Sequence, residues 1–187
     1  MAQTVLTISS EQTTTYVRNF NPFNQTSARA TTKDFIYEPL AIFNRLAGAK
    51  WEYRLAESHE LADDLKSISF TLRDGLKWSD GEPLTVDDVI FTYDYLKKFP
   101  ALDFNSVSKL MESVEKVDER TVRFNLIQPN SLVATTIVAM PIVPEHIWKD
   151  VADPVTFANE NPVGSGPLTE ITRFTPQVYE QCRNPHY

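Results

Sequence analysis

The chain has 187 residues and 42% hydrophobic content, which is typical of a folded protein of one domain or slightly more. Its 25 Asp and Glu outnumber its 18 Lys and Arg, so the net charge is −7. This acidic balance, without a dense basic segment, predicts no nucleic-acid partner. No run of about 18 apolar residues occurs, so the sequence indicates no membrane-spanning helix.

Few side chains could support catalysis or metal binding. Cys182 is the single cysteine, so no disulfide can form within the chain, and it is expected to be a half-buried apolar residue. The three histidines, His59, His146 and His186, are far apart and lack the spacing of metal ligands. We therefore expect no catalytic residue, no metal site and no cofactor.

The first third of the chain predicts extended segments around a short helix. Residues 4–10, TVLTISS, show the apolar–polar alternation of a strand. A helix of one or two turns is expected within residues 27–44, with a boundary near Pro39, because proline restricts the residue before it. Residues 51–58, WEYRLAES, are expected to be extended.

The middle of the chain gives the clearest pattern. Residues 67–75, SISFTLRDG, alternate apolar and polar side chains and end in Asp-Gly, which predicts a half-buried strand closed by a turn. Thr85 stands three residues before Asp88, as in a capping box. The apolar spacing that follows predicts a helix over residues 86–98, which Phe99-Pro100 ends.

The second half predicts hairpins and short helices. Residues 111–126 predict a hairpin, and residues 131–140 a short apolar helix that Ser131 or Asn130 caps. A short strand and then a helix with Pro144 at its first position are expected in residues 141–150.

Residues 166–182 predict two strands around a Thr-Pro turn. Strands and helices are thus mixed without regular βαβ alternation. The predicted fold class is α/β, of a mixed kind with α+β character.

Several spaced motifs resemble one family. The segment 55–93 contains LRDG, then Trp78, then DGEPLT and Asp88-Val89, in that order. PIVPEHIW at 141–148 and NPVGSGPL at 161–168 follow, and NPHY ends the chain. These motifs are similar to those of the family 5 solute-binding proteins, the peptide/nickel type that serves ABC importers of oligopeptides and oligosaccharides. The motifs themselves are expected to be mostly structural.

The resemblance implies a fold, a location and a partner. It implies the N-terminal part of a periplasmic-binding-protein-like II fold, with mixed sheets and flanking helices. Residues 1–36 and 160–187 would form an incomplete lobe I, and residues 37–159 an inserted small subdomain. The location would be periplasmic, although the sequence shows no signal peptide, and the partner would be an ABC permease of the inner membrane.

The family proteins are roughly three times longer, so the resemblance also implies that this chain is a truncated N-terminal portion. Its second lobe would be absent, which should weaken ligand binding, because closure of two lobes supplies much of the buried contact. Strand edges left unpaired could support a dimer.

The stretch RNFNPF at 18–23 resembles the start of members that bind β-linked oligosaccharides, most of all the chitooligosaccharide-binding proteins of marine bacteria. Sugar rings pack their C–H faces on aromatic rings, and their hydroxyl or acetamido groups pair with Arg and Asn. Leu168 departs from the family, which often has an aromatic residue there. The resemblance implies ligand-binding roles for Arg18, Asn19, Phe20, Asn21, Ser165 and Gly166.

Other interpretations of these residues remain open. Phe20 and Phe23 could belong to the core with Pro22 in a turn, and Ser165-Gly166 could only form a hairpin. The ligand could be an oligopeptide or a cello-oligosaccharide, or the chain could act only as a protein-interaction domain. A glycoside hydrolase needs two carboxylates beside a cleft. The candidates are better explained as turn and cap residues, so no enzyme is expected; they are Asp63-Asp64, Asp87-Asp88 and Glu38.

Overall fold

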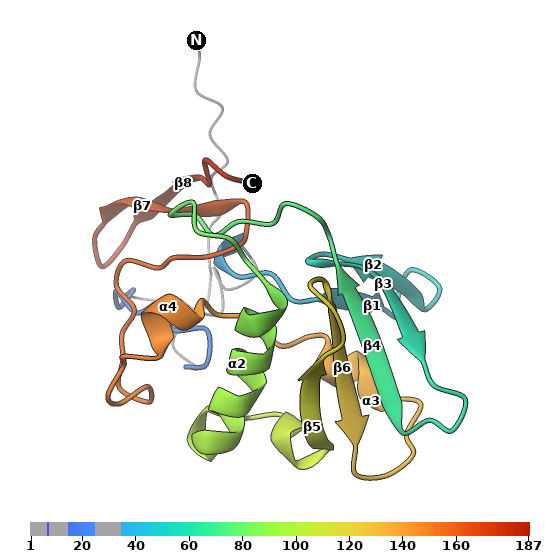
Figure 1. Ribbon diagram of the computed structural model, residues 1–187. Coiled ribbons are helices and arrows are strands. Elements are labelled where there is room, and N and C mark those ends of the chain that lie inside the picture. Colours follow the sequence, from blue (N-terminus) through green and yellow to red (C-terminus); the bar gives the residue numbers. More distant parts are fainter. Residues whose placement is uncertain (1–6, 8–14, 25–34) are drawn as a thin grey trace.

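The computed structural model describes residue 7 and residues 15–24 and 35–187 (Figure 1). The strand expected at 4–10 therefore lies outside the described residues, apart from residue 7. Of the helix expected within 27–44, the described part holds only two helical residues, 35 and 36, before the chain becomes extended. Among the helices of the described residues, none is long and apolar enough to cross a membrane.

A four-stranded antiparallel sheet forms the centre of one half of the molecule. Its strand order is β3–β4–β6–β5, and its strands are β3 (Ala56–Leu61), β4 (Ser67–Leu72), β5 (Met111–Lys116) and β6 (Thr121–Leu126). The alternation in β4 buries Ile68, Phe70 and Leu72, as the sequence predicts. The strand at 67–75 and the hairpin at 111–126 are confirmed, with β4 ending at Leu72.

Helix α2 (Val86–Lys98) lies between this sheet and the other half of the molecule (Figure 1). The capping box is present: the side chain of Thr85 accepts the backbone N–H of Asp88, and the side chain of Asp88 accepts the backbone N–H of Thr85. Phe99 ends the helix, and two short 3₁₀ turns, η1 (Pro100–Leu102) and η2 (Val107–Lys109), follow. The predicted helix and both of its ends are thus confirmed.

Asp88 does more than cap α2. The residue is only 6% exposed, and its carboxylate accepts hydrogen bonds from the backbone N–H of Thr85 at 2.9 Å and of Glu145 at 3.0 Å. The indole Nε1 of Trp78 lies 3.4 Å from the same carboxylate. One buried carboxylate therefore joins the start of α2 to the start of α4 (Glu145–Trp148).

The two short helices differ in detail from the sequence pattern. Helix α3 spans Val133–Ile137, and the side chain of Asn130 accepts the N–H groups of Leu132 and Val133 at 2.9 and 3.2 Å. Pro144 precedes α4 in extended conformation, so the prediction that it is the first helical residue is wrong by one position. The strand expected near 141 is reduced to one bridge between Pro39 and Pro141.

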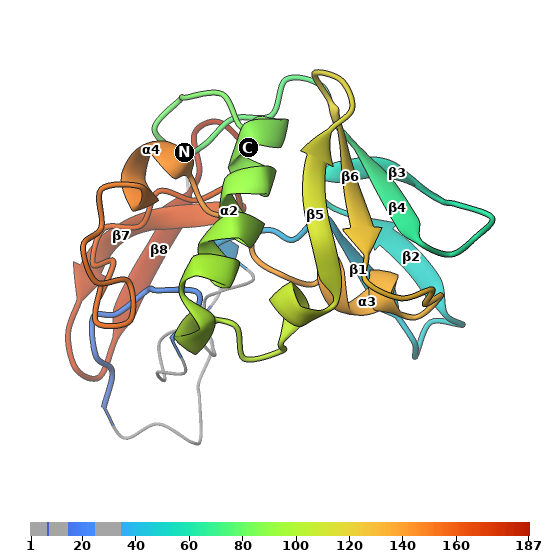
Figure 2. The same cartoon turned by 60° about the horizontal axis from the view of Figure 1, so that its bottom comes forward.

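Two separate hairpins complete the fold. β1 (Ala41–Asn44) pairs with β2 (Lys50–Tyr53), and β7 (Leu168–Phe174) pairs with β8 (Tyr179–Arg183). In Figures 1 and 2, β7–β8 and α4 lie on one side of α2, and the four-stranded sheet with β1–β2 lies on the other. The two strands predicted in 166–182 are confirmed.

One hydrophobic core runs through both sides, because α2 packs on each of them: Tyr93 meets Phe124 of β6 with ring centroids 4.8 Å apart, and Tyr95 meets Trp148 of α4 at 6.1 Å. The mixed α/β fold class is confirmed. The division into residues 1–36 with 160–187 and residues 37–159 stays a prediction.

We expect Asp88→Asn to destabilise the fold by about 1 to 3 kcal/mol, because the substitution removes the buried charge that accepts two backbone N–H groups. The free energy of unfolding from urea denaturation measures this effect. Asp87→Asn is the matched control, since the Asp87 side chain is exposed and pairs with Lys116 at 3.3 Å. Its expected change is within about 0.5 kcal/mol. Equal losses in the two variants would contradict a special role of Asp88.

Candidate functional site

The segment RNFNPF is held against the loop at 154–161. Asn21 is fully buried, and its amide donates to the carbonyl oxygens of Pro154 at 2.9 Å and Phe157 at 2.8 Å. Its side-chain oxygen accepts the N–H of Phe23 at 2.9 Å. These three bonds fix the path of the chain in a place that water does not reach.

The two phenylalanines of this segment are both 2% exposed. Phe20 packs edge-on against Phe174 and Tyr179, with ring centroids 6.0 and 6.1 Å apart. The interpretation that Phe20 and Phe23 belong to the core is confirmed. A ligand contact by Phe20 or Asn21 stays a prediction, and their burial indicates support rather than direct contact.

Arg18 and Asn19 lie at the start of the segment. The guanidinium of Arg18 donates to the Glu160 carbonyl at 3.1 Å and to the side-chain oxygen of Asn161 at 2.8 Å. It also lies over the ring of Phe174, 5.8 Å from the ring centroid. Arg18 is half-buried, and an arginine carries five N–H donors, so its orientation is fixed while donors remain for another molecule. Asn19 is 9% exposed, and its side chain accepts the N–H of Asn21 at 3.0 Å.

Beside Arg18 lies an aromatic patch, which consists of Tyr16, Phe174 and Tyr179. All three rings are half-buried. Phe174 and Tyr179 are register partners of the β7–β8 hairpin and stack with centroids 5.9 Å apart, and Tyr16 meets Tyr179 edge-on at 4.8 Å. Aromatic rings next to a fixed guanidinium can bind the C–H face and the hydroxyl groups of a sugar.

Sequence reasoning missed this patch. The signal available was a pair of aromatic residues flanking the predicted Thr-Pro turn, because residues on either side of a tight turn face each other across a hairpin. No local sequence pattern indicated that Tyr16 packs against these two aromatic residues.

Ser165 and Gly166 lie in a different place, where the 161–166 loop crosses residues 35–38. The Ser165 hydroxyl accepts the N–H of Glu38 at 3.0 Å, and the N–H of Gly166 donates to the Ile36 carbonyl at 2.8 Å. A Cβ at Gly166 would lie 2.2 Å from the Phe35 carbonyl oxygen. Both residues are buried, and the contacts are structural, so their ligand-binding role also stays a prediction.

At the same crossing, Glu38 is a buried carboxyl group, 7% exposed. Burial raises its pKa above the usual value, and the bond from the Tyr187 hydroxyl at 3.1 Å and the charges of Arg54 and Arg73 act in the opposite direction. The described residues hold no cluster of three or more His, Cys, Asp or Glu that could bind a metal ion.

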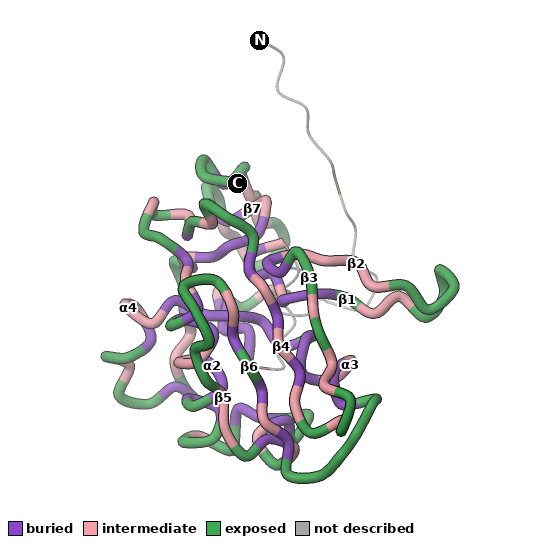
Figure 3. Tube along the Cα trace, turned by 45° about the vertical axis from the view of Figure 1, so that its right-hand side comes forward, coloured by how far each residue is buried: buried purple, intermediate pink, exposed green. Residues whose placement is uncertain are grey.

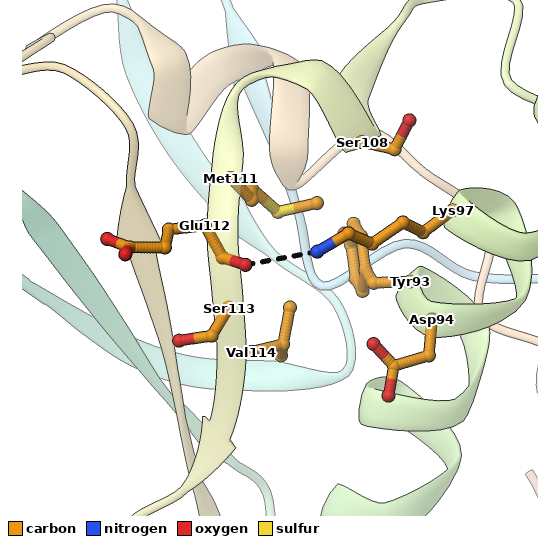
Figure 4. A pocket seen from close by; sticks show the side chains of 8 residues that line it. All are labelled: Tyr93, Asp94, Lys97, Ser108, Met111, Glu112, Ser113 and Val114. Atoms are coloured by element: carbon orange, nitrogen blue, oxygen red, sulfur yellow. Dashed lines mark hydrogen bonds between the residues drawn. The ribbon is translucent and has the colours of Figure 1, made fainter.

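Cavities within the described part of the chain offer little alternative. The space between α2 and β5 has a volume of about 10 Å³, and the bond from the Lys97 ammonium to the Glu112 carbonyl crosses it (Figure 4). That volume holds about one water molecule. A wider hollow of about 240 Å³ opens between η2 and the end of β6; its lining residues are Lys109, Leu110, Ile127, Gln128, Asn130 and Val133.

We expect Asn21→Ala to destabilise the fold by about 2 to 4 kcal/mol, because two buried carbonyls and one buried N–H lose their partner. Asn24→Ala is the control, since Asn24 is half-buried and the hydrogen bond found at this residue uses its backbone N–H. Thermal unfolding followed by circular dichroism measures both variants. A melting temperature of Asn21→Ala equal to that of Asn24→Ala would show that the three bonds contribute nothing.

Comparison with known proteins agrees with this fold and these motifs. The family model of the bacterial extracellular solute-binding proteins, family 5 Middle, matches residues 50–187. A periplasmic oligopeptide-binding protein of an oligopeptide ABC transporter from Thermotoga maritima has a similar structure, with a TM-score of 0.79 and 33% identity. The match covers 91% of this chain and 32% of that one.

Two further matches concern glycans. The structure of the Thermotoga maritima protein with bound mannohexaose gives a TM-score of 0.79 and 36% identity over 90% of this chain and 31% of that one. The peptidoglycan-binding protein YepA of Agrobacterium fabrum is 34% identical, and the match covers 90% of this chain and 29% of that protein. The present chain thus spans about a third of the length of the proteins that it matches.

Proteins of a solute-binding family bind their ligands and do not convert them, which agrees with the expectation that the chain is no enzyme. The matched segment and the shared fold show that this chain belongs to the family 5 bacterial extracellular solute-binding proteins.

Proposed function

We propose that the chain is part of the extracytoplasmic solute-binding component of an ABC importer, and that its ligands are chitooligosaccharides, the β-1,4-linked oligomers of N-acetylglucosamine. The observation that carries this proposal is the aromatic patch of Tyr16, Phe174 and Tyr179 beside Arg18. Stacked rings offer apolar area to a sugar face, and the oriented guanidinium offers donors to an acetamido carbonyl or a hydroxyl group.

Two relatives support a sugar ligand. The Thermotoga maritima structure contains mannohexaose, an oligosaccharide, and its sequence is 36% identical to this chain. The Agrobacterium fabrum relative is named for peptidoglycan, whose glycan strands are β-1,4-linked N-acetylated amino sugars. Both relatives are therefore consistent with an oligosaccharide ligand, and the one named for peptidoglycan is consistent with an acetamido sugar.

The ligand-binding roles divide between contact and support. We assign direct contact to Arg18, because it is half-buried and an arginine has more N–H donors than its bonds to Glu160 and Asn161 use. Asn19, Phe20, Asn21, Ser165 and Gly166 would act through the path of the backbone, since they are buried. Delivery to an inner-membrane permease and a periplasmic location belong to the same proposal.

An oligopeptide ligand is the second candidate. The same Thermotoga maritima protein is named a periplasmic oligopeptide-binding protein, and its sequence is 33% identical to this chain. A peptide would use its amide groups where a sugar uses hydroxyl and acetamido groups. A cello-oligosaccharide would use the same rings but lacks the acetamido carbonyl.

We expect a calorimetric titration of this chain to show saturable heat with chitotriose and little with cellotriose or a tripeptide. The affinity should be low, because a cleft between two lobes buries more of a ligand than one patch does. Arg18→Ala should raise the dissociation constant for chitotriose about tenfold, which corresponds to the loss of one charge-assisted hydrogen bond.

Arg173→Ala is the matched control, because Arg173 lies on the same hairpin, is exposed and pairs with Glu180 at 3.3 Å. It should leave chitotriose binding unchanged. Heat with the tripeptide alone would refute the sugar ligand. If none of the three ligands gives heat of binding, the patch is refuted as a binding surface, provided that a cooperative thermal transition shows that the chain is folded.

A further inference from the structure

The β1–β2 hairpin is attached to the molecule mainly through side chains. It forms its own two-stranded sheet and shares no ladder of hydrogen bonds with the β3–β4–β6–β5 sheet. Its base is tied by the bonds from the N–H groups of Arg54 and Ala56 to the Leu40 carbonyl. Beyond this base the β1–β2 hairpin extends to an exposed tip (Figure 3). Leu46, in the turn between β1 and β2, is fully exposed.

Aromatic rings line the side of the hairpin that meets β3. Phe43 and Trp51 are register partners, and their ring centroids lie 4.9 Å apart. Tyr53 has the same orientation as Trp51, because alternate residues of a strand point to the same side. Phe43, Trp51 and Tyr53 are all half-buried, so this attachment is open to water at its edge.

His59 on β3 is the group that these rings meet. Its imidazole lies 4.7 Å from the Trp51 ring and stacks on Phe70 of β4 at 5.7 Å, with an angle of 26° between the planes. The hydroxyl of Tyr53 lies 2.8 Å from its Nδ1 atom. His59, itself on the edge strand β3 of the central sheet, therefore contacts both the hairpin and the neighbouring strand β4.

The surroundings of His59 favour the neutral imidazole. Burial lowers its pKa below the usual 6.5. Tyr53 is the titratable group in contact with it from β2, and Phe70 is its partner on β4. The charged residues Lys50 and Glu52 alternate with Trp51 and Tyr53 and so point to the other side of the hairpin.

The acidic residues of β3 itself are also directed elsewhere. Glu57 pairs with Arg120 at 3.3 Å, and Glu60 follows His59 directly and so points to the opposite side of the strand. A positive imidazolium would thus stand among aromatic rings without a carboxylate partner from its own strand.

We propose that the β1–β2 hairpin is a pH-sensitive arm, which packs on the central sheet when His59 is neutral and loosens when His59 gains a proton. The direction of the pH dependence follows from the lowered pKa of His59. Because the packed state binds the His59 proton less tightly than the loosened state does, neutral His59 stabilises the packed arm at a pH above the pKa of the loosened state. This stabilisation is lost as the pH falls through the pKa of the packed state. Loosening would expose the rings of Phe43 and Trp51, so acidification would open an apolar surface on the arm.

Amide hydrogen exchange followed by NMR on this chain tests the proposal. Between about pH 7.5 and about pH 5, we expect the protection factors of residues 42–53 to fall about threefold or more, while those of β4 and β6 stay constant. The imidazole signal of His59 should titrate over the same range, with a midpoint below that of a free histidine. Protection factors are already corrected for the pH dependence of chemical exchange.

Two variants decide whether His59 is the cause. His59→Phe keeps a ring between Trp51 and Phe70 but cannot ionise, so its hairpin protection should not change with pH. His146→Gln removes the histidine that pairs with Asp80 at 2.8 Å, far along the chain, and should leave the response intact. The proposal is overturned if protection in residues 42–53 does not depend on pH, or if His59→Phe responds as the natural chain does.

Discussion

The arrangement of the whole chain depends on one close backbone crossing, where the 161–166 loop passes over residues 35–38. A Cβ at Gly164 would lie 2.1 Å from the Ile36 carbonyl oxygen, so only glycine permits this approach. The crossing is closed by Gly166 N–H to Ile36 and by Glu38 N–H to Ser165. Because residues 35–38 lead into the sheet side and the 161–166 loop leads into β7, this contact sets how the two sides of α2 meet.

The candidate site is a consequence of that crossing. The loop at 154–161 reaches the crossing directly, and its carbonyls hold Asn21 from one side while Asn161 and Glu160 hold Arg18 from the other. The β7–β8 hairpin leaves the crossing and brings Phe174 and Tyr179 to Phe20. Buried residues thus set the positions of the half-buried residues of the proposed site. A site built in this way has its geometry fixed before the ligand arrives.

Local signals in the sequence predicted local structure. The ends of α2 were predictable because Thr85, Asp88 and Pro100 each act within one turn of the helix. The hydrogen bond from the Glu145 N–H to the Asp88 carboxylate was not predictable, because it joins residues 57 positions apart. Likewise, the burial of Asn21 in RNFNPF depends on carbonyls at 154 and 157, which no local pattern indicates. The aromatic patch was missed for the same reason, since Tyr16 and Tyr179 meet only in the folded chain.

The aromatic rings and the N–H donors of Arg18 would contribute differently to which sugar the proposed site selects. Stacking on Tyr179 and Phe174 depends on C–H faces, which glucose and N-acetylglucosamine oligomers share, so the rings alone discriminate weakly between them. Discrimination requires a polar partner that one ligand satisfies and the other leaves without its hydrogen bond. In the proposed site Arg18 would be this partner, because Asn161 and Glu160 orient its guanidinium and its cation lies over Phe174. On the proposed function, the aromatic patch would supply affinity for β-linked sugars in general, and the oriented donors of Arg18 would add a preference for the acetamido carbonyl.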